Sequence, residues 1–548
     1  MQYYLLYYIC LISVSLNGEA LDNYRVEEVG RIIGTTSLRK IMFAISESGE
    51  KKVRKDDFVS ATEPVTSREV IGIIREVTAS NQLLPDEFAR ESAMGEFVTS
   101  YGLTDGEFIV GIVDILGHIN GEGIEPPKHS LRPASPVFMT KDETIAKLLR
   151  VPEARAMPVG TVETRPSVTV SLDANRLVGM HCAILAMTGA GKSYTGGVII
   201  EELLKKGGAV VVFDPHGEYK YLGYKSDGSE SEFYDQIKVL GIGKRAEKRL
   251  KIRANGLTAD DIASMSPGTS ETQRDMLYEI IGICADQKQS YNLGDLSEVL
   301  HMVLEKKGGE DNGEEIVKDS LDSRIEKLAK KANASTTTAL IRRIESLQRS
   351  GFISNEETPL EELVKPGQVT VIDLSGLSES IREIVVAALS RKIFYARMNY
   401  LNDYKEEKLD VPCFIVVEEA HNFVPKEYER EIVSRGILRR IAREGRKFGV
   451  GLCLISQRPS RLDQDVLSQC NTQIIMKIVN PLDQDFIRKS AEAVTDDIIR
   501  DLPGLGRGEA IISGAAINFP MKVKIKKRDT KPGGEDIDII GEWNKGKK

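Results

Sequence analysis

The sequence predicts an α/β core that is interrupted by a helical subdomain and preceded by a small β-barrel. Three patterns in the 548-residue chain support this fold class. An apolar strand leads through a glycine-bearing loop into a helix, short strands crowd the N-terminal region, and helical periodicity runs almost continuously over residues 257–350. With 41% hydrophobic and 28% charged residues, the composition is that of a soluble globular protein.

Changes in these patterns divide the chain into six segments. In order, they are an apolar N-terminal extension (1–23), a β-barrel domain (24–165), the first part of the α/β core (166–256), an inserted α-helical subdomain (257–350), the second part of the core (351–525) and a C-terminal tail (526–548). A chain of 548 residues has room for about three to four domains.

The N-terminal extension differs from the rest of the chain. Met1–Gly18 carries no charged side chain and contains the apolar run Tyr3–Ile12. A signal peptide needs a positively charged start, and a membrane span needs about 20 apolar residues. We therefore interpret the extension as an addition from an upstream start codon, with no role in the fold, and we expect no membrane association.

The next domain is predicted to be a barrel because its strands are short, dense and separated by turn residues. The expected strands are 28–33, 40–46, 58–62, 69–78 and 107–116, with closure by 136–138 and 156–163. A helical insertion is expected at 86–101. No catalytic cluster is visible in this domain, so its expected role is structural or docking.

The core is organised around Ile184–Ser193, where a strand, a glycine-bearing loop and a helix follow one another. This order forms a phosphate cradle from inward-facing amides and the positive end of a helix. Lys192 is expected to reach the β- and γ-phosphates of ATP, and Ser193 to hold Mg²⁺. Ala186 stands where the motif usually has its first glycine. The candidate nucleotide-binding residues of the loop are Thr188, Gly189, Ala190, Gly191, Lys192, Ser193 and Tyr194.

A second motif supplies carboxylates. The apolar strand 414–417 ends in Glu418 and Glu419, as a Walker B strand does. Glu418 is expected to orient the water shell of Mg²⁺, and Glu419 to polarise the attacking water. Another strand, 451–455, ends near Gln457, which is our candidate sensor of the γ-phosphate. An amide that satisfies a turn is the alternative for Gln457. Together with the loop, these motifs predict a RecA-like P-loop ATPase core.

Two regions are rich in basic residues, although a net charge of −8 restricts any nucleic-acid surface to a local patch. Residues 426–461 contain ten Lys or Arg and four Glu. Within them, Arg443 and Arg446 are candidates for an arginine finger or for a clamp on DNA phosphates. Residues 324–349 contain seven Lys or Arg and two Glu, which favours either a face toward a polyanion or an ordinary solvated helix surface.

The six cysteines are scattered and show no spacing typical of a zinc site. Several lie inside apolar strands, so we interpret them as buried thiols. Free thiols persist in a reducing compartment, which indicates a cytoplasmic protein.

Four segments occur together in an order that resembles the archaeal HerA family, of the HerA/FtsK group of DNA-pumping ATPases. They are Met187–Ser193, Asp214–Tyr219, Val417–His421 and Glu444–Ser460. The likeness includes the N-terminal barrel, called the HAS barrel in that family, and extends from about Tyr24 to the tail. Joint occurrence makes this resemblance far more specific than the phosphate loop alone.

The resemblance implies a homo-hexameric ring that hydrolyses ATP with Mg²⁺ and translocates on double-stranded DNA. It also implies work with the NurA nuclease in DNA end resection for recombinational repair, with the barrel on the face toward the nuclease. The residues that match the family's motifs are Lys192 and Ser193 in the nucleotide loop, Glu418 as the metal-side acid, Glu419 as the catalytic base, Gln457 as the sensor and Asp214 as the acid at the second strand. Asp214 is therefore a further candidate for binding the nucleotide.

One position departs from the family's pattern. The family often has a basic residue just before the histidine that leads into the loop strand, whereas Met180 precedes His181 here. The resemblance therefore does not extend to a nucleotide contact at that position.

Two other functions stay open at this stage. A membrane-anchored DNA or protein pump of the conjugation or secretion type would need the N-terminal extension as its anchor. A nucleotide-switched scaffold would recruit a nuclease without translocating. The acid pair Glu418 and Glu419 favours turnover over a scaffold.

Overall fold

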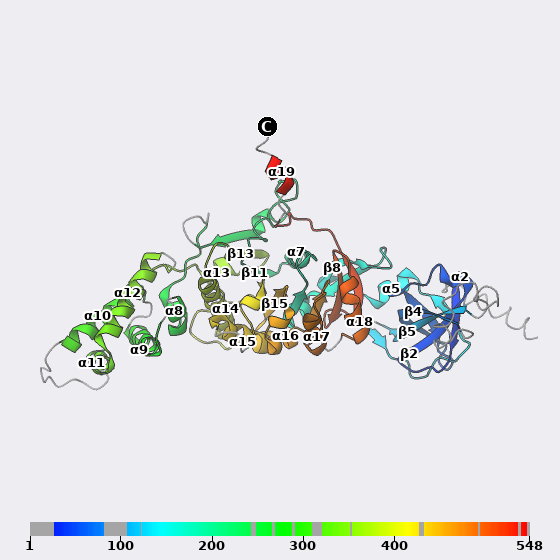
Figure 1. Ribbon diagram of the computed structural model, residues 1–548, viewed down its shortest axis with the longest axis horizontal. Coiled ribbons are helices and arrows are strands. Elements are labelled where there is room, and N and C mark those ends of the chain that lie inside the picture. Colours follow the sequence, from blue (N-terminus) through cyan, green and yellow to red (C-terminus); the bar gives the residue numbers. More distant parts are fainter. Residues whose placement is uncertain are drawn as a thin grey trace, which may run out of the picture. The chain divides into compact units, whose positions relative to one another are not determined.

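The described residues form two compact units (Figure 1). One unit consists of the described residues up to 172 together with 495–501 and 509–525, and the other of the described residues within 173–494, 502–508 and those from 526 onward. The computed structural model describes residues 27–81, 107–121, 123–242, 248–265, 269–287, 291–308, 321–350, 353–426, 432–490, 494–534 and 539–544. The N-terminal extension and the helix expected at 86–101 lie outside the described residues.

In the first unit, six strands close into a barrel, as the sequence predicts. Each pairs with two neighbours in the order β2-β1-β7-β3-β4-β5, and β2 pairs in turn with β5. The strands are β1 (Glu28–Ile33), β2 (Lys40–Ile45), β3 (Phe58–Thr62), β4 (Glu69–Asn81), β5 (Glu107–Asn120) and β7 (Pro136–Met139). Apolar side chains such as Val29, Phe43 and Val137 are fully buried in its core. This unit is therefore held together by an ordinary hydrophobic interior.

The segment 156–163 does not close the barrel, so that prediction is wrong. Strand β8 (Ala156–Val162) pairs antiparallel with β18 (Met521–Ile525), which pairs with β17 (Glu509–Gly514). Because β7 already bonds to both β1 and β3, the described ring offers β8 no open edge. Other short elements of this unit are α2 (Glu47–Glu50), β6 (Gly123–Glu125), α5 (Asp142–Leu148) and α18 (Asp496–Asp501).

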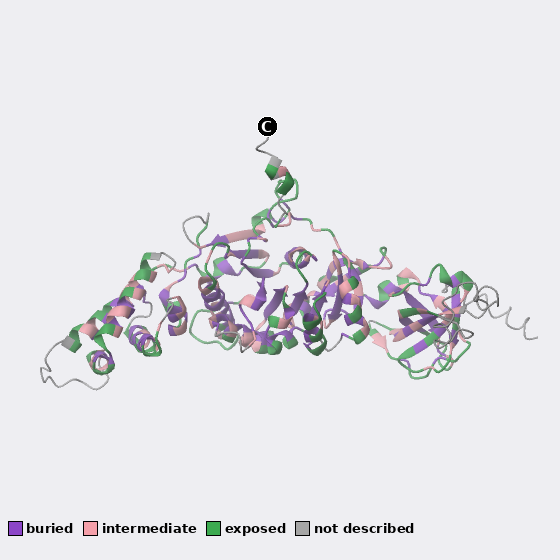
Figure 2. Cartoon of the chain, viewed as in Figure 1, coloured by how far each residue is buried: buried purple, intermediate pink, exposed green. Residues whose placement is uncertain are grey.

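The second unit contains a parallel sheet in the order β12-β13-β11-β14-β15-β10-β16. Its strands are β10 (Cys182–Leu185), β11 (Ala209–Asp214), β12 (Ile237–Gly241), β13 (Gln368–Asp373), β14 (Cys413–Val417), β15 (Val450–Ser456) and β16 (Thr472–Ile475). The central strands are buried along their whole length (Figure 2), as expected where helices cover both faces of a sheet. The register places Phe213 beside Val417, and Leu185 beside Ser456. The loops that follow these strands therefore emerge at one edge of the sheet.

The helices of the second unit outside residues 257–350 are α6 (Ala174–Gly179), α7 (Lys192–Lys205), α13 (Leu360–Leu363), α14 (Glu379–Leu401), α15 (Val433–Phe448), α16 (Gln464–Gln469), α17 (Pro481–Ser490) and α19 (Ile539–Asn544), while β9 (Thr169–Asp173) leads into α6. Helix α14 packs against α15. The five cysteines that the structure describes are buried thiols, as predicted.

The predicted helical periodicity over residues 257–350 is confirmed. The helices there are α8 (Ala259–Met265), α9 (Glu271–Gln287), α10 (Leu293–Gly308), α11 (Leu321–Lys331) and α12 (Ala334–Ser350). On α11, Ile325 and Leu328 are buried while Lys327 and Lys330 are exposed, which is the pattern of an amphipathic surface helix. Within the described part of the chain, every helix is too short or too polar to cross a membrane.

Candidate nucleotide-hydrolysis site

The glycine-bearing loop has the backbone that a phosphate cradle requires. Gly189 and Gly191 have φ angles of 80° and 110°, in the left-handed region that side chains disfavour. Gly191 is the N-cap of α7, so the amides of the first helical turn face the loop. Ala186 has no such φ and is buried, which explains why the position of the motif's first glycine tolerates a methyl group.

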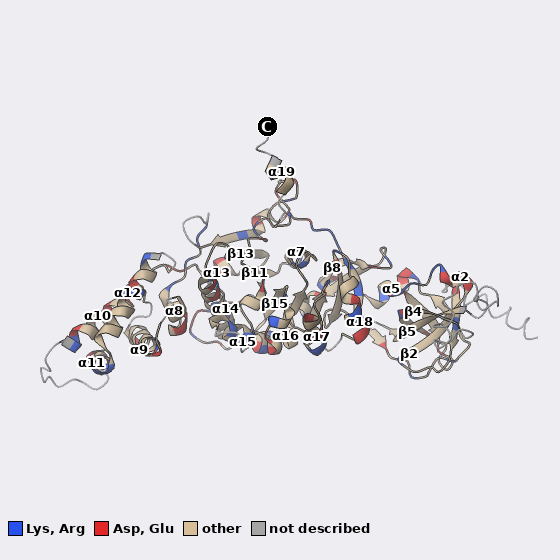
Figure 3. Cartoon of the chain, in the orientation of Figure 1, with Lys and Arg blue, Asp and Glu red and all other residues tan. Residues whose placement is uncertain are grey.

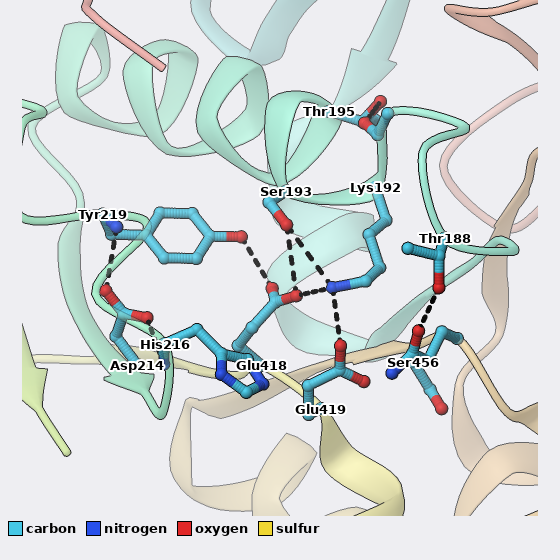
Figure 4. Close-up of polar contacts among 12 residues, drawn as sticks. Thr188, Lys192, Ser193, Thr195, Asp214, His216, Tyr219, Glu418, Glu419 and Ser456 are labelled. Atoms are coloured by element: carbon cyan, nitrogen blue, oxygen red, sulfur yellow. Dashed lines mark hydrogen bonds and ion pairs between the residues drawn. The ribbon is translucent and has the colours of Figure 1, made fainter. Parts of the chain in front are cut away.

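Lys192 lies between the two carboxylates of the Walker B strand (Figure 4). Its Nζ bonds to Glu418 and lies 2.9 Å from Glu419 Oε1. Burial by itself lowers the pKa of Lys192, but the two carboxylates outweigh burial and raise it above its ordinary value. The ammonium group therefore stays charged and holds both acids beside the phosphate loop.

Glu418 is fully buried and uses both carboxylate oxygens. Ser193 Oγ donates to Oε1 at 3.2 Å, and the Tyr219 hydroxyl donates to Oε2 at 2.8 Å. Burial raises the pKa of Glu418 to about 7, against the opposing effect of Lys192. Ser193 and Glu418, which the sequence predicts to share one metal site, are in contact in the fold.

Glu419 is 3% exposed and has a left-handed backbone, with φ of 51°. Its Oε2 lies 3.3 Å from His421 Nδ1, which is also 3.1 Å from Ser456 Oγ. Burial lowers the pKa of His421, so the imidazole is neutral at pH 7. The sequence pattern predicts no role for His421, whose only local signal is its place two residues after the acid pair.

Asp214 is buried at the end of β11, and its carboxylate is bonded to its own loop. The backbone amides of Gly217 and Tyr219 each donate to it at 2.8 Å. Burial raises the pKa of Asp214, while these amides lower it. Asp214 therefore fixes the loop that carries Tyr219, a residue to which the sequence analysis assigned no role.

The sensor candidate and the basic candidates lie in different surroundings. Gln457 bonds to the Thr188 hydroxyl at the phosphate loop. Arg443 and Arg446 are exposed on α15, among the basic residues of that helix (Figure 3). Arg443 lies 3.1 Å from Asp465, whereas Arg446 has no hydrogen bond or ion pair to any described residue.

Tyr194, also a candidate nucleotide contact, turns toward the C-terminal segment. Its hydroxyl accepts a hydrogen bond from the Arg528 amide at 2.8 Å. The Arg528 guanidinium lies over the Tyr194 ring, 5.8 Å from its centre. The fold therefore places the Tyr194 side chain against residues of the tail and away from the acid pair.

These residues fit ATP phosphates with Mg²⁺. No heavy atom lies within 4 Å of where a Cβ on Gly189 would stand, so the loop has open space beside it. Glu419 Oε2 is buried yet accepts no hydrogen bond from any described residue. Within the described ranges, no three His, Cys, Asp or Glu side chains could hold a metal by themselves. Mg²⁺ commonly completes its shell with water and phosphate oxygens, which suits one carboxylate and one hydroxyl.

Comparison with known proteins assigns the family. A profile described as "Helicase HerA, central domain" matches residues 157–393. The DNA double-strand break repair helicase HerA of Pyrococcus furiosus is 34% identical, over 95% of this chain and 98% of that protein. The chain belongs to the HerA family. Another HerA relative, a probable DNA double-strand break repair helicase from Methanocaldococcus jannaschii, is 32% identical over 94% of this chain and 98% of that protein.

Two solved structures are similar to this HerA-family chain in part of their fold. VirB4 of Thermoanaerobacter pseudethanolicus matches at 14% identity and a TM-score of 0.44, over 69% of this chain and 97% of that chain. The plasmid coupling protein TrwB in complex with ADP and Mg²⁺ matches at 12% identity and a TM-score of 0.46, over 72% of this chain and 94% of that chain. By its membership of the HerA family, the protein is a P-loop ATPase and helicase.

Proposed function

We propose that this protein is an ATP-driven translocase or helicase on double-stranded DNA that acts in the cytoplasm, in DNA end resection for recombinational repair. The observation that carries the proposal is Lys192 held between Glu418 and Glu419 at the start of α7. A lysine and two acids gathered at a phosphate loop suit phosphoryl transfer to water. The relatives' names, DNA double-strand break repair helicases, supply the substrate and the process.

Each side chain of the site has a proposed task. Lys192 binds the β- and γ-phosphates, while Ser193 and Glu418 hold the Mg²⁺ shell. When bound, Mg²⁺ neutralises charge on the phosphate oxygens. Glu419 accepts the proton of the attacking water, because its Oε2 is buried and accepts no hydrogen bond from any described residue. Gln457, which bonds to Thr188 of the loop, senses the γ-phosphate from β15.

The first test is steady-state ATP hydrolysis with and without linear duplex DNA, for the wild type and Glu419→Gln. Stimulation by DNA that vanishes in the variant is the expected result. Hydrolysis that is indifferent to DNA would overturn the motor and favour the nucleotide-switched scaffold. Failure to displace a protein roadblock from DNA, despite normal hydrolysis, would also favour the scaffold.

We further propose a homo-hexameric ring in which Arg446 acts as an arginine finger on the neighbouring subunit's ATP. Arg446 is exposed at the end of α15 and bonds to no described residue, whereas Arg443 is held by Asp465. Arg446→Ala should bind nucleotide normally but lose turnover about a thousandfold. Arg443→Ala is the matched control and should keep turnover within a few-fold. Normal ATPase activity in Arg446→Ala would rule out this assignment.

The proposed partner is a NurA-type nuclease. The closed barrel of the first unit has no catalytic role in this scheme, which leaves it available for docking. A copy of the protein lacking the barrel should lose nuclease binding in size-exclusion chromatography. If nuclease binding is retained, the docking site lies outside the barrel. Membrane fractionation tests the remaining alternative, a membrane-anchored pump. Recovery of the protein in the membrane fraction would support that alternative.

A further inference from the structure

We propose that Tyr219 is a positioning residue that holds the Glu418 carboxylate in the orientation its metal-side role requires. This inference rests on the proposed function insofar as Glu418 is taken to face the metal. It adds a residue outside the motifs of the phosphate loop and of the acid pair. Three features support this role of Tyr219: the contact with Glu418, the loop behind Tyr219, and a glycine in α7.

The contact divides the two oxygens of Glu418 between different groups (Figure 4). Oε1 faces Lys192 and Ser193, the residues expected to meet phosphate and metal. Oε2 accepts a hydrogen bond from the Tyr219 hydroxyl at 2.8 Å. A carboxylate that is bonded at both oxygens cannot rotate without losing a bond, so the tyrosine fixes which oxygen faces the loop.

Tyr219 is itself held firmly. The whole side chain is buried, and its backbone amide donates to Asp214 at 2.8 Å. Glu418 follows β14, the neighbour of β11 in the sheet, and its amide donates to the Phe213 carbonyl at 3.2 Å. The two loops therefore leave adjacent strands side by side, and Asp214 sets the position from which the tyrosine reaches across.

Helix α7 makes room for the phenol at Gly196. A Cβ on Gly196 would stand 2.7 Å from the Tyr219 hydroxyl oxygen and 2.9 Å from Ile455 Cδ1, both closer than real contacts allow, but 3.6 Å from the adjoining ring carbon of Tyr219. The Ile455 methyl group is the end of a flexible side chain, whereas the phenol oxygen is held by Glu418. Glycine inside a helix is less stable than alanine, so its presence here needs a reason. The hydroxyl supplies the stronger reason, because it is the nearer atom and its position is fixed by the bond to Glu418.

The test of the positioning role is the Mg²⁺ dependence of binding of a fluorescent ATP analogue, in the Glu419→Gln background that prevents turnover. Tyr219→Phe should need about tenfold more Mg²⁺ for half-maximal tight binding, because a hydrogen bond to a charged group is lost. Binding without Mg²⁺ should not change. Tyr278→Phe is the matched control, since that hydroxyl also bonds to a carboxylate, Asp260, at 2.6 Å but lies in the helical subdomain.

A Mg²⁺ requirement in Tyr219→Phe within twofold of its parent would overturn the proposal. If Tyr219→Phe fails to fold, Gly196→Ala serves in its place, because the added methyl group pushes the hydroxyl away from Glu418. It should raise the Mg²⁺ requirement in the same direction. No Mg²⁺-dependent nucleotide binding in the parent protein would instead count against the proposed function.

A double-mutant cycle on stability tests the geometry independently of catalysis. Gly196→Ala should lower the denaturant midpoint in the wild type, where the methyl group meets the Tyr219 hydroxyl. In the Tyr219→Phe background, where that oxygen is gone and only the Ile455 methyl group must give way, the same substitution should lower the midpoint less. Equal losses in both backgrounds would show that Gly196 does not make room for the hydroxyl.

Discussion

Buried carboxylates have different hydrogen-bond partners in the two units. In the barrel unit, Glu63 is 1% exposed, and its oxygens bond to the Thr66 hydroxyl and to the His129 amide at 2.9 Å. In the parallel-sheet unit, Glu418 and Glu419 converge on one lysine, and an oxygen of Glu419 accepts no hydrogen bond from the described residues. A satisfied buried carboxylate stabilises its own loop, whereas an incompletely satisfied pair beside a phosphate loop is prepared for a ligand.

The strongest test of this comparison removes the charge of Glu419. Glu419→Gln keeps the shape of the side chain but cannot accept a proton from water. Turnover should fall about a thousandfold. Thermal unfolding should change far less than turnover, because the amide oxygen of glutamine can still accept from Lys192 and Glu418 still pairs with that lysine. Turnover within tenfold of the wild type would show that another group is the base.

The second test uses pH. Burial raises the pKa of Glu418 to about 7 from an ordinary 4.5, so the folded state favours the protonated form. Its contribution to stability is fully present below about pH 4.5 and is lost as the pH rises through about 7, a difference of about 3 kcal/mol. The free energy of unfolding of the wild type should therefore fall more than that of Glu418→Gln between pH 4.5 and 8. Parallel curves would contradict this.

The third test makes the matching change in the barrel. Glu63→Gln replaces an acceptor-only carboxylate by an amide, which should cost about 2 kcal/mol of unfolding free energy. ATP turnover should stay within twofold of the wild type, because Glu63 serves only its own unit. Denaturant unfolding and steady-state hydrolysis measure the two quantities. A large loss of ATP turnover at an unchanged free energy of unfolding would contradict the proposed difference between the two units.

The smallest effect is expected at an exposed pair. Arg349 on α12 lies 3.7 Å from Glu345, and the two side chains are 70% and 40% exposed. Arg349→Ala should change the free energy of unfolding by less than about 0.5 kcal/mol. DNA affinity of this variant, measured at low and high salt, also tests the basic stretch 324–349. An unchanged affinity would leave that stretch as solvated surface.

Much of the site could be predicted from the sequence, because the backbone conformation and position of its key residues depend on the few residues around them. Gly189 and Gly191 adopt the left-handed conformations that the loop motif requires, and Glu418 and Glu419 follow a buried strand as expected. Helices and strands were predicted where apolar periodicity was strong. The order of the strands within the sheet was not, because it depends on contacts far apart in the chain.

Some residues for which the sequence predicts no role act through contacts between loops that lie far apart in the chain. Tyr219 and Glu418 lie 199 residues apart in the sequence and meet because β11 and β14 are neighbours. Asp214 matches a family acid, yet its carboxylate is bonded to its own loop. No local pattern distinguishes an acid that serves a ligand from one that serves its own backbone.

The sequence by itself determined the phosphate loop, the acid pair, the helical subdomain and most strands of the barrel. Each depends on spacing within a few residues, where propensity and periodicity carry the information. Only the tertiary structure decided that β8 pairs with β18, that Lys192 lies between two carboxylates, and that Gly196 leaves room for a tyrosine. These are contacts between distant segments, and they follow from strand order and close packing rather than from any local pattern.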